Sequence, residues 1–343
     1  MHLQGVLVED RHQDTILYAG NLDVRITDWF FFKKNIELKY VGLENAIIKF
    51  QRTDSVWSQQ FLIDYFSSPS TGQTKKEGIH LDLKKLEFKN VVLLKKDGWL
   101  GEDMTAQIGQ LSLEANKLNL SGKTFDINSV IITDPVFTLN NYKKLKPFSP
   151  APAADTVAND VVDSLLQWNR GGMLIKIGEL KIKNGIFRAY KQTGQPILSY
   201  FDGQHIEFGQ INTEMTALQL EGATLYTSLH LSAKERSGLE IKNMLADVKM
   251  TPQSMAFSNL TIQTNHSVIK NFFSMSYADL GDMDDFIHKI KMTGNFDSSE
   301  IDSDDIAFFA PDLKSWKKKI LLKGKVRGAV DDLVGRDMII QAG

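Results

Sequence analysis

Two acidic clusters in the last quarter of the chain are the first candidates for chemistry. Asp279-Leu280-Gly281-Asp282-Met283-Asp284-Asp285 gathers carboxylates around a glycine, and Ca²⁺ prefers such oxygen ligands. The cluster lacks the spacing of an EF-hand loop and its bidentate glutamate, so a turn that caps a helix is the favoured interpretation. Asp302, Asp304 and Asp305 likewise suit helix caps before Ile306 better than a catalytic carboxylate pair.

The other reactive residue types form no recognisable site. The chain contains no cysteine, which excludes a thiolate nucleophile and any zinc site that uses cysteine. Nucleophile-elbow, zinc-protease, Walker and dinucleotide-binding motifs do not occur. The seven histidines have no metal-ligand spacing and are interpreted as isolated surface or strand residues; they are His2, His12, His80, His205, His230, His266 and His288. We therefore predict no enzyme activity, no cofactor and no metal.

Composition narrows the class of protein further. Hydrophobic residues make up 42% and charged residues 24% of the 343 residues, which are globular values. Forty Lys and Arg against 42 Asp and Glu leave a net charge of −2, which argues against nucleic-acid binding. No window reaches the roughly 18 apolar residues that span a bilayer, and the first residues lack a signal-peptide pattern. Both termini have strand patterns, so we expect a segment of a longer protein whose anchor lies elsewhere.

Alternation of apolar and polar residues is the dominant pattern, and it predicts strands buried on one face. Leu22, Val24 and Ile26 alternate with charged or polar residues, and Ile36 and Leu38 do the same. Turn residues fall between such segments at short intervals. The pattern recurs at Ile79 to Leu83, Leu111 to Leu113, Leu118 to Leu120, Leu180 to Ile182, Leu218 to Leu220, Leu229 to Leu231, Leu260 to Ile262 and Ile290 to Met292. We predict many short strands in antiparallel order.

A short repeat accompanies this alternation. Leu86-Glu87-Phe88-Lys89-Asn90 recurs as Leu180-Lys181-Ile182-Lys183-Asn184 and as Leu239-Glu240-Ile241-Lys242-Asn243. Each copy places two apolar residues on one strand face. Asn tolerates left-handed geometry, so we expect it to close each strand. Irregular repetition of one strand type suits a sheet that grows by adding similar strands.

Two linkers and a few helices divide the chain into several predicted units. Residues 1–66 form an N-terminal β unit that ends in a short aromatic helix with Trp57, Phe61 and Tyr65 on one face. Residues 67–78 form a linker, 79–145 a second β unit, 146–154 a Pro-rich linker and 155–170 an amphipathic helix. Residues 171–343 form further β units, with a short helix near 304–310 that Pro311 ends.

Several local patterns, in this order, resemble the AsmA-like and TamB-type translocation and assembly proteins of the Bacteroidetes type. They include Leu7-Val8-Glu9-Asp10-Arg11 with Asp14 to Gly20, Trp29-Phe30-Phe31, and Thr53-Asp54-Ser55-Val56-Trp57 with Gln60 to Asp64. Ser237 to Asn243, Met250-Thr251-Pro252, Phe257 to Leu260 and Asp305 to Lys314 follow. The last block is the most characteristic, and the blocks together span nearly the whole chain.

The resemblance implies a mainly β fold: an elongated, curved antiparallel sheet that forms a groove, with a few short helices. It also implies a periplasmic protein whose full-length parent is anchored in the inner membrane, and whose apolar groove moves phospholipid between the inner and outer membranes in support of outer-membrane biogenesis. The implied partners are phospholipids, both membranes and an outer-membrane assembly protein. No nucleic acid is expected.

The apolar faces allow two structures, a closed sandwich core and an open sheet that holds acyl chains, and periodicity alone does not separate them. In the open structure, Lys39, Lys89 and Lys183 would meet phosphates at the rim. A scaffold for outer-membrane proteins that pairs through strand edges and a hydrolase or lectin-like β domain are the alternatives. The candidate groove-lining residues are Leu22, Val24, Ile26, Ile36, Leu38, Leu111, Leu113, Leu180, Ile182, Leu239, Ile241, Ile290 and Met292.

Overall fold

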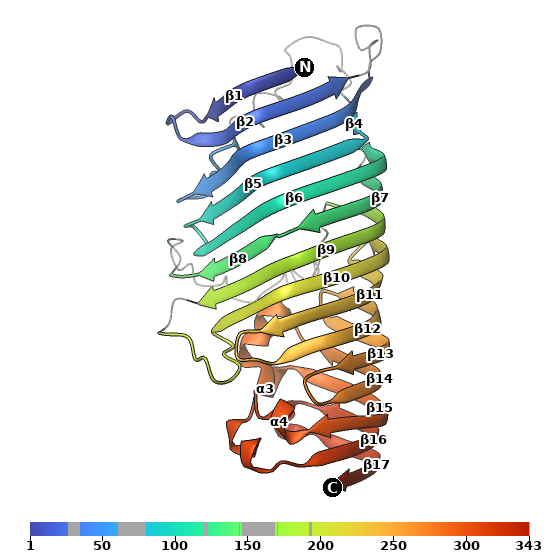
Figure 1. Cartoon of the computed structure of the whole chain (residues 1–343). Coiled ribbons are helices and arrows are strands. Elements are labelled where there is room, and N and C mark those ends of the chain that lie inside the picture. The colour runs from blue at the N-terminus through green and yellow to red at the C-terminus, as the bar shows by residue number, and fades with distance from the viewer. Residues whose placement is uncertain are drawn as a thin grey trace, which may run out of the picture. The chain divides into compact units, whose positions relative to one another are not determined.

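The computed structural model describes residues 1–26, 35–60, 80–119, 123–143, 145, 169, 171–191 and 194–342. These residues form one large, mostly antiparallel sheet of seventeen strands (Figure 1). The longest helical element that they contain has six residues. The prediction of a mainly β, antiparallel fold with a few short helices is therefore confirmed.

The chain divides into two compact units. Unit 1 consists of Met1–Pro150 and Ile182–Gly194, and unit 2 consists of Ala151–Lys181 and Gln195–Gly343. Strand β9 (Leu174–Lys191) contributes its first part to unit 2 and its second part to unit 1. The predicted linkers 67–78 and 146–154 lie outside the described residues, as do nearly all of the helix at 155–170 and the second half of the aromatic helix.

Unit 1 is built from long strands that pair mainly with their neighbours in sequence. Most of the pairs are antiparallel, but β3 runs parallel to β4 and β5, and β8 runs parallel to β9. The strands are β1 (His2–Glu9), β2 (Thr15–Ile26), β3 (Asn35–Arg52), β4 (His80–Leu83), β5 (Lys85–Asp97), β6 (Glu102–Asn119), β7 (Thr124–Thr133) and β8 (Val136–Asn141).

Unit 2 is a simple meander in which each strand is antiparallel to the next. Short turns suffice for most connections; Gly222, for example, has a φ of +56° between two strands, a conformation that favours glycine. The strands are β10 (His205–Glu221), β11 (Thr224–Glu235), β12 (Glu240–Thr251), β13 (Ser254–Gln263), β14 (Val268–Ser276), β15 (Lys291–Asp302), β16 (Lys319–Gly328) and β17 (Val334–Ala342).

A row of left-handed residues crosses the strands of unit 1. Asn45, Asn90, Asp134 and Asn184 all have φ between +51° and +53°, which short polar side chains tolerate best after glycine. Strand register places Asn45 beside Asn90 and Asp134 beside Asn184. The Asn90 amide donates to Asn45 Oδ1 at 3.1 Å, and the Asn184 amide donates to Asp134 Oδ1 at 2.7 Å. Side-chain hydrogen bonds therefore join the four residues in two pairs.

This row corrects one detail of the sequence analysis. Asn90 and Asn184 are left-handed, as expected, but they do not close their strands, because β5 continues to Asp97 and β9 to Lys191. Asn243, in the third copy of the repeat, has no positive φ. A left-handed residue inside a strand changes the side-chain alternation locally. As a result, Phe88 and Val91 can face the same side although they are three residues apart.

Small side chains pack next to the left-handed row. Ala19, Ala46 and Val91 are at most 1% exposed and form one cluster. Register aligns them across β2, β3 and β5. Larger apolar residues pack against this cluster from both directions along the strands; they are Val6, Leu17, Leu22, Leu43, Phe88 and Leu93.

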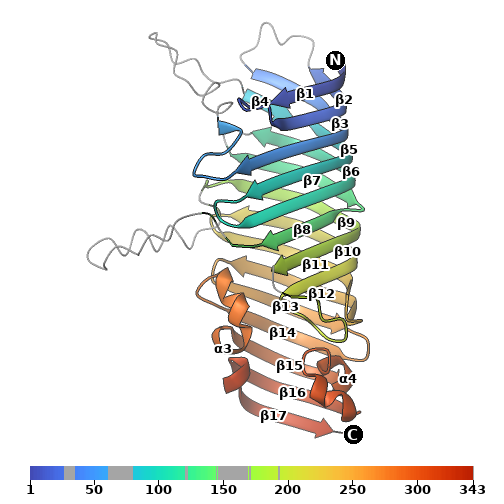
Figure 2. The same ribbon diagram turned by 90° about the vertical axis from the view of Figure 1, so that its left-hand side faces the viewer.

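The helical segments of unit 2 lie at opposite ends of β15 (Figure 2). Before β15 come η2 (Leu280–Asp285), capped by Asp279, and α3 (Phe286–Lys289). After it come α4 (Ser303–Ile306) and η3 (Pro311–Ser315); η4 (Val330–Asp332) follows β16. A short capped helix does lie near 304–310, but it spans only 303–306 with Asp302 as the cap, and Pro311 begins η3 and does not end this helix.

Candidate functional site

The predicted lining residues of unit 1 meet in two cross-strand rows. In the first row, Leu22 of β2 lies opposite Leu43 of β3. The row continues through Phe88 of β5 to Leu111 of β6. The neighbouring row runs from Val24 through Val41 and Leu86 to Leu113. The rows end at Ile132 and Val130 of β7. Since residues two apart on a strand share a face, both rows belong to one apolar face.

Only part of this face was predicted from the sequence. Leu22, Val24, Leu111 and Leu113 were identified, whereas Val41, Leu43, Leu86, Phe88, Val130 and Ile132 were not. Ile26 is half-buried on the same strand as Leu22. Ile36 and Leu38 lie in β3, but their side chains are outside the described set. The strand in which Leu43 and Ala46 lie breaks simple alternation at Asn45, which is why period-two counting missed it.

Unit 2 has an apolar face of different composition. Four methionines stand directly opposite one another across β12 to β15: Met250, Met255, Met275 and Met292. Next to them runs a second row of Val248, Phe257 and Phe273, which packs against the buried residues Met244, Ala246 and Leu260. Of these residues, only Met292 was among the predicted lining residues.

The remaining predicted residues are placed as follows. Leu180 and Ile182 are half-buried in β9, and Ile241 is half-buried in β12. Leu239 is 9% exposed and Ile290 is 0% exposed. Ile290 is therefore packed inside the protein and cannot line an accessible surface, and Leu239 contributes very little to one.

Most of the large side chains of these faces remain partly exposed; Val130, Met244 and Leu260 are buried. Among the described apolar residues larger than alanine, only Val91, Leu260 and Ile290 are 2% exposed or less. Strand β16 shows the pattern clearly: Ile320, Leu322 and Val326 are half-buried, while Leu321, Lys323 and Lys325 are exposed. In a closed sandwich, a second layer would bury such residues almost completely. The described residues therefore provide apolar faces that protein atoms cover only in part.

The opposite face of unit 1 is polar and rich in ion pairs. Lys89 Nζ lies 2.7 Å from Glu44 Oε1, and Lys85 Nζ lies 2.9 Å from Glu87 Oε1. Tyr40 donates a 2.8 Å hydrogen bond to Glu87. A hollow of about 440 Å³ lies along these residues. The Lys89 ammonium thus has a carboxylate partner on the polar face. The side chains of Lys39 and Lys183 are exposed and form no ion pair with a described residue.

Unit 1 contains a buried ion pair where β3 and β5 end. The Arg52 guanidinium donates to both oxygens of Asp97 at 2.7 Å, and the Asp97 side chain is 1% exposed. These hydrogen bonds from Arg52 lower the pKa of Asp97, although burial acts in the opposite direction. The guanidinium carbon of Arg52 also lies over the Trp57 ring, 4.5 Å from its centre. The pair joins the ends of two parallel strands.

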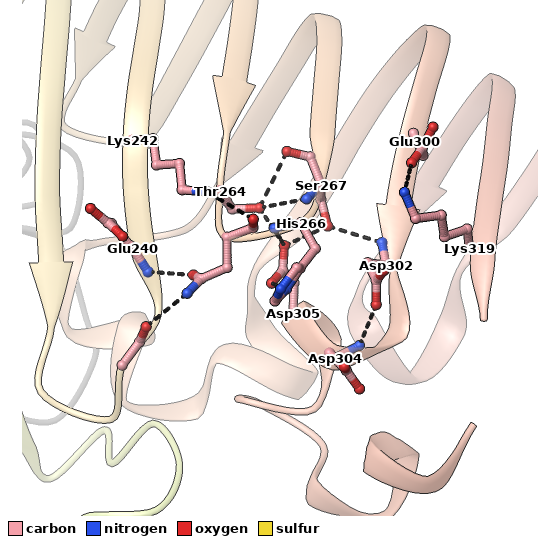
Figure 3. Close-up of polar contacts among 12 residues, drawn as sticks. Glu240, Lys242, Thr264, His266, Ser267, Glu300, Asp302, Asp304, Asp305 and Lys319 are labelled. Atoms are coloured by element: carbon pink, nitrogen blue, oxygen red, sulfur yellow. Dashed lines mark hydrogen bonds and ion pairs between the residues drawn. The ribbon is translucent and has the colours of Figure 1, made fainter. Parts of the chain in front are cut away.

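Asp305 is the corresponding buried carboxylate of unit 2 (Figure 3). It accepts hydrogen bonds from the Ser267 hydroxyl at 2.7 Å, from the Thr264 hydroxyl at 2.5 Å and from the His266 backbone N–H at 3.0 Å. Burial alone would raise the pKa of Asp305, but these hydrogen bonds outweigh burial and lower it. The contacts attach α4 to the turn between β13 and β14.

The residue types at this turn resemble a catalytic triad, but their bonding does not. In a triad the serine donates to the histidine, which the aspartate orients. Here Ser267 Oγ donates directly to Asp305, and His266 Nδ1 lies 3.2 Å from the same carboxylate. Ser267 is buried with 3% exposure. This arrangement positions a backbone segment and does not activate a nucleophile.

Three observations complete the site. No group of three or more His, Cys, Asp or Glu with metal-binding geometry occurs among the described residues, and this includes the Asp279–Asp285 cluster as far as it is described. In that same part of the chain, no helix has the length and hydropathy needed to cross a bilayer. Comparison with protein-family models found no matching family, and comparison with curated proteins found no match.

Proposed function

We propose that this chain binds the acyl chains of phospholipids on its apolar sheet faces and forms part of a periplasmic path for phospholipid between the inner and outer membranes, in support of outer-membrane biogenesis. The observation that supports the proposal most directly is the partial exposure of the aligned apolar rows in both units. The order of local patterns that resemble AsmA-like and TamB-type proteins supports the periplasmic assignment.

The free-energy cost of an uncovered apolar face in water favours the binding of acyl chains. Exposed apolar surface is unfavourable in water, and each acyl methylene that it buries contributes on the order of 0.8 kcal/mol. Rows of Leu, Val, Phe and Met offer contacts without directional bonds. A bound chain can therefore shift along the face without breaking hydrogen bonds, which suits transport better than tight storage.

Adjacent residue pairs allow a matched test. Ile47 is 43% exposed on one face of β3, while its neighbour Ile48 is half-buried on the apolar face beside Leu17 and Leu93. Leu321 is 48% exposed on β16, while Leu322 is half-buried on the other face. The Ile48→Glu and Leu322→Glu variants should lose lipid, whereas the Ile47→Glu and Leu321→Glu variants should retain it.

The measurement is mass spectrometry of organic extracts of the purified chain, after incubation with phospholipid vesicles. Circular dichroism and the unfolding midpoint identify variants that fail to fold. Phospholipid bound to the wild type and to the outward variants only would support the proposal. A folded wild type without phospholipid, or equal loss from both members of each pair, would contradict it.

A scaffold that pairs through strand edges is the second candidate. Strand β17 pairs with β16, and three of its apolar residues are strongly exposed: Val334 at 56%, Ile339 at 54% and Ile340 at 61%. A strand from a client protein could add at the other edge of β17. Replacing Ile339 with proline should abolish client binding but leave lipid binding unchanged, which separates the two candidates in a pull-down with unfolded outer-membrane protein.

A further inference from the structure

The segment from Phe309 to Lys319, which we name the aromatic–lysine segment, combines exposed aromatic rings with unpaired cations. Phe309 is 60% and Trp316 is 56% exposed. Lys314, Lys317 and Lys318 are exposed as well. None of the three lysines forms an ion pair with a described residue, whereas Lys319 pairs with Glu300 at 2.6 Å.

The base of this segment is fixed to the sheet. Asp305 anchors α4 to the β13–β14 turn, as described above. The backbone N–H of Ser303 donates to the carbonyl of Lys318 at 2.9 Å, and the backbone N–H of Lys318 donates to Ser303 Oγ at 2.9 Å. These contacts close the loop at its two ends. The exposed rings are therefore held by ordered backbone and do not depend on a free tail.

Phe308 and Phe309 show that the exposure is selective. Phe308 lies against the backbone at Gly238, and its carbonyl accepts a hydrogen bond from Phe201 N–H. The Phe309 ring is exposed to solvent on one side. On the other side its centre lies 5.3 Å from the centre of the Phe201 ring. Leu198, three residues before Phe201, is 69% exposed. Phe308 thus anchors the chain just before the segment, and the Phe309 ring remains largely exposed to solvent.

We infer that the aromatic–lysine segment docks on an anionic phospholipid bilayer surface. Trp and Phe rings partition favourably to the boundary between headgroups and acyl chains. The three unpaired lysines all lie within two residues of Trp316, where they can meet lipid phosphates. The exposed carboxylate of Asp312 also belongs to the segment, four residues before Trp316, while that of Asp304 precedes the segment, so the lysines outnumber the carboxylates in it. Since the whole chain has a net charge of −2, attraction to an anionic surface must come from a local cluster of this kind.

Docking goes beyond binding of acyl chains to the sheet, because it concerns an intact bilayer and a different part of unit 2. A lysine near an anionic surface contributes about fivefold in affinity. Replacing all three lysines with glutamine should therefore weaken binding by roughly a hundredfold. The apolar contribution should be independent of salt, whereas the lysine contribution should fall as ionic strength rises.

Vesicle flotation tests the inference with the full chain. We expect the wild type to float with vesicles of phosphatidylcholine and phosphatidylglycerol, and to remain in solution with vesicles of phosphatidylcholine alone. The Phe309→Ser/Trp316→Ser variant and the Lys314→Gln/Lys317→Gln/Lys318→Gln variant should lose flotation. Matched controls in other parts of the chain are Leu100→Ser, which removes an apolar side chain that is 48% exposed, and Lys123→Gln/Lys143→Gln/Lys176→Gln, which removes three exposed lysines.

Two outcomes would overturn docking through this segment: flotation of the segment variants at the wild-type level, or equal flotation on both vesicle types. Lipid extraction from the same samples separates this inference from the proposed function. If the segment variants still contain phospholipid but do not float, docking and acyl binding are separate. If the wild type floats but contains no phospholipid after it is re-isolated from the vesicles, docking stands although the proposed function fails.

Discussion

The two units fill the same kind of apolar face with different side chains. In unit 1 the rows consist of Leu, Val, Ile and one Phe, next to a line of Ala19, Ala46 and Val91. In unit 2 one row is formed by methionines, and Phe257 faces Phe273 in the next. Branched side chains are stiff, whereas methionine is unbranched, polarizable and adaptable. We therefore expect unit 2 to accommodate a wider range of acyl shapes.

The units also differ in how they hold a buried carboxylate. Unit 1 opposes Asp97 with the full charge of Arg52. Unit 2 surrounds Asp305 mainly with hydroxyl groups and a backbone N–H. A buried charge that loses its closest, directly bonded counter-charge is more costly than one that loses one of several neutral donors. Similar sheets can therefore depend on very different polar contacts. The variants described next test this difference between the two units.

The largest effect is expected for Arg52→Met. Removing the guanidinium leaves the buried Asp97 with only the more distant ammonium of Lys95, whose Nζ lies 3.9 Å from Asp97 Oδ2, which should lower the free energy of unfolding by about 3 kcal/mol. Chemical denaturation measures this loss. Lys85→Met is the matched control, because Lys85 and Glu87 are both about 40% exposed; it should cost less than about 1 kcal/mol. Equal losses in the two variants would show that burial of the pair is unimportant.

Asp305→Asn should lower the free energy of unfolding by about 2–3 kcal/mol at neutral pH, because the amide cannot accept all the hydrogen bonds that the carboxylate accepts. The pKa of Asp305 is lowered in the folded protein. Its stabilising contribution is therefore complete above the unfolded pKa of about 4 and declines as the pH falls through the folded value. Denaturation at a series of pH values should show the gap between wild type and variant closing below about pH 4. A gap that is constant with pH would contradict the charged state of Asp305.

Gly109→Ala should destabilise unit 1 by about 1–3 kcal/mol. A Cβ at this position would lie 2.9 Å from the Thr133 carbonyl oxygen and 3.1 Å from Asp134 Cβ. Gly209→Ala in unit 2 is the control, because nothing lies within 4 Å of its Cβ position. Thermal unfolding should separate the two variants; a similar shift in both would mean that the strands next to Gly109 move apart easily.

The smallest effect is expected at the left-handed row. Asn90→Val places a β-branched residue at a φ of +52°, which should cost about 1–2 kcal/mol. Asn90→Gly relieves the backbone but loses the bond to Asn45, so its loss should be under about 1 kcal/mol. We expect the wild type to have the highest thermal stability, Asn90→Gly a lower one and Asn90→Val the lowest, which would support the geometric role of the row. An Asn90→Val variant as stable as Asn90→Gly would contradict that role.

Much of the fold was predictable from local pattern. Alternation at Leu22, Val24 and Ile26 predicted a strand with one apolar face, and the acidic residues before Ile306 predicted a cap. The candidate face was predicted less completely. Leu43 and Ala46 are three residues apart, so simple alternation assigns them to opposite faces until the left-handed Asn45 between them is known.

The sequence by itself determined the strand-rich fold, the apolar and polar faces of individual strands and the absence of cysteine chemistry, because these depend on residue type and on a period of two along one strand. Only the tertiary structure decided which strands are neighbours, and therefore that four methionines stand in one row and that Asn45 lies beside Asn90. It also decided that Ile290 is buried while Leu322 stays half-exposed. Both depend on contacts between residues far apart in sequence, which no local pattern encodes.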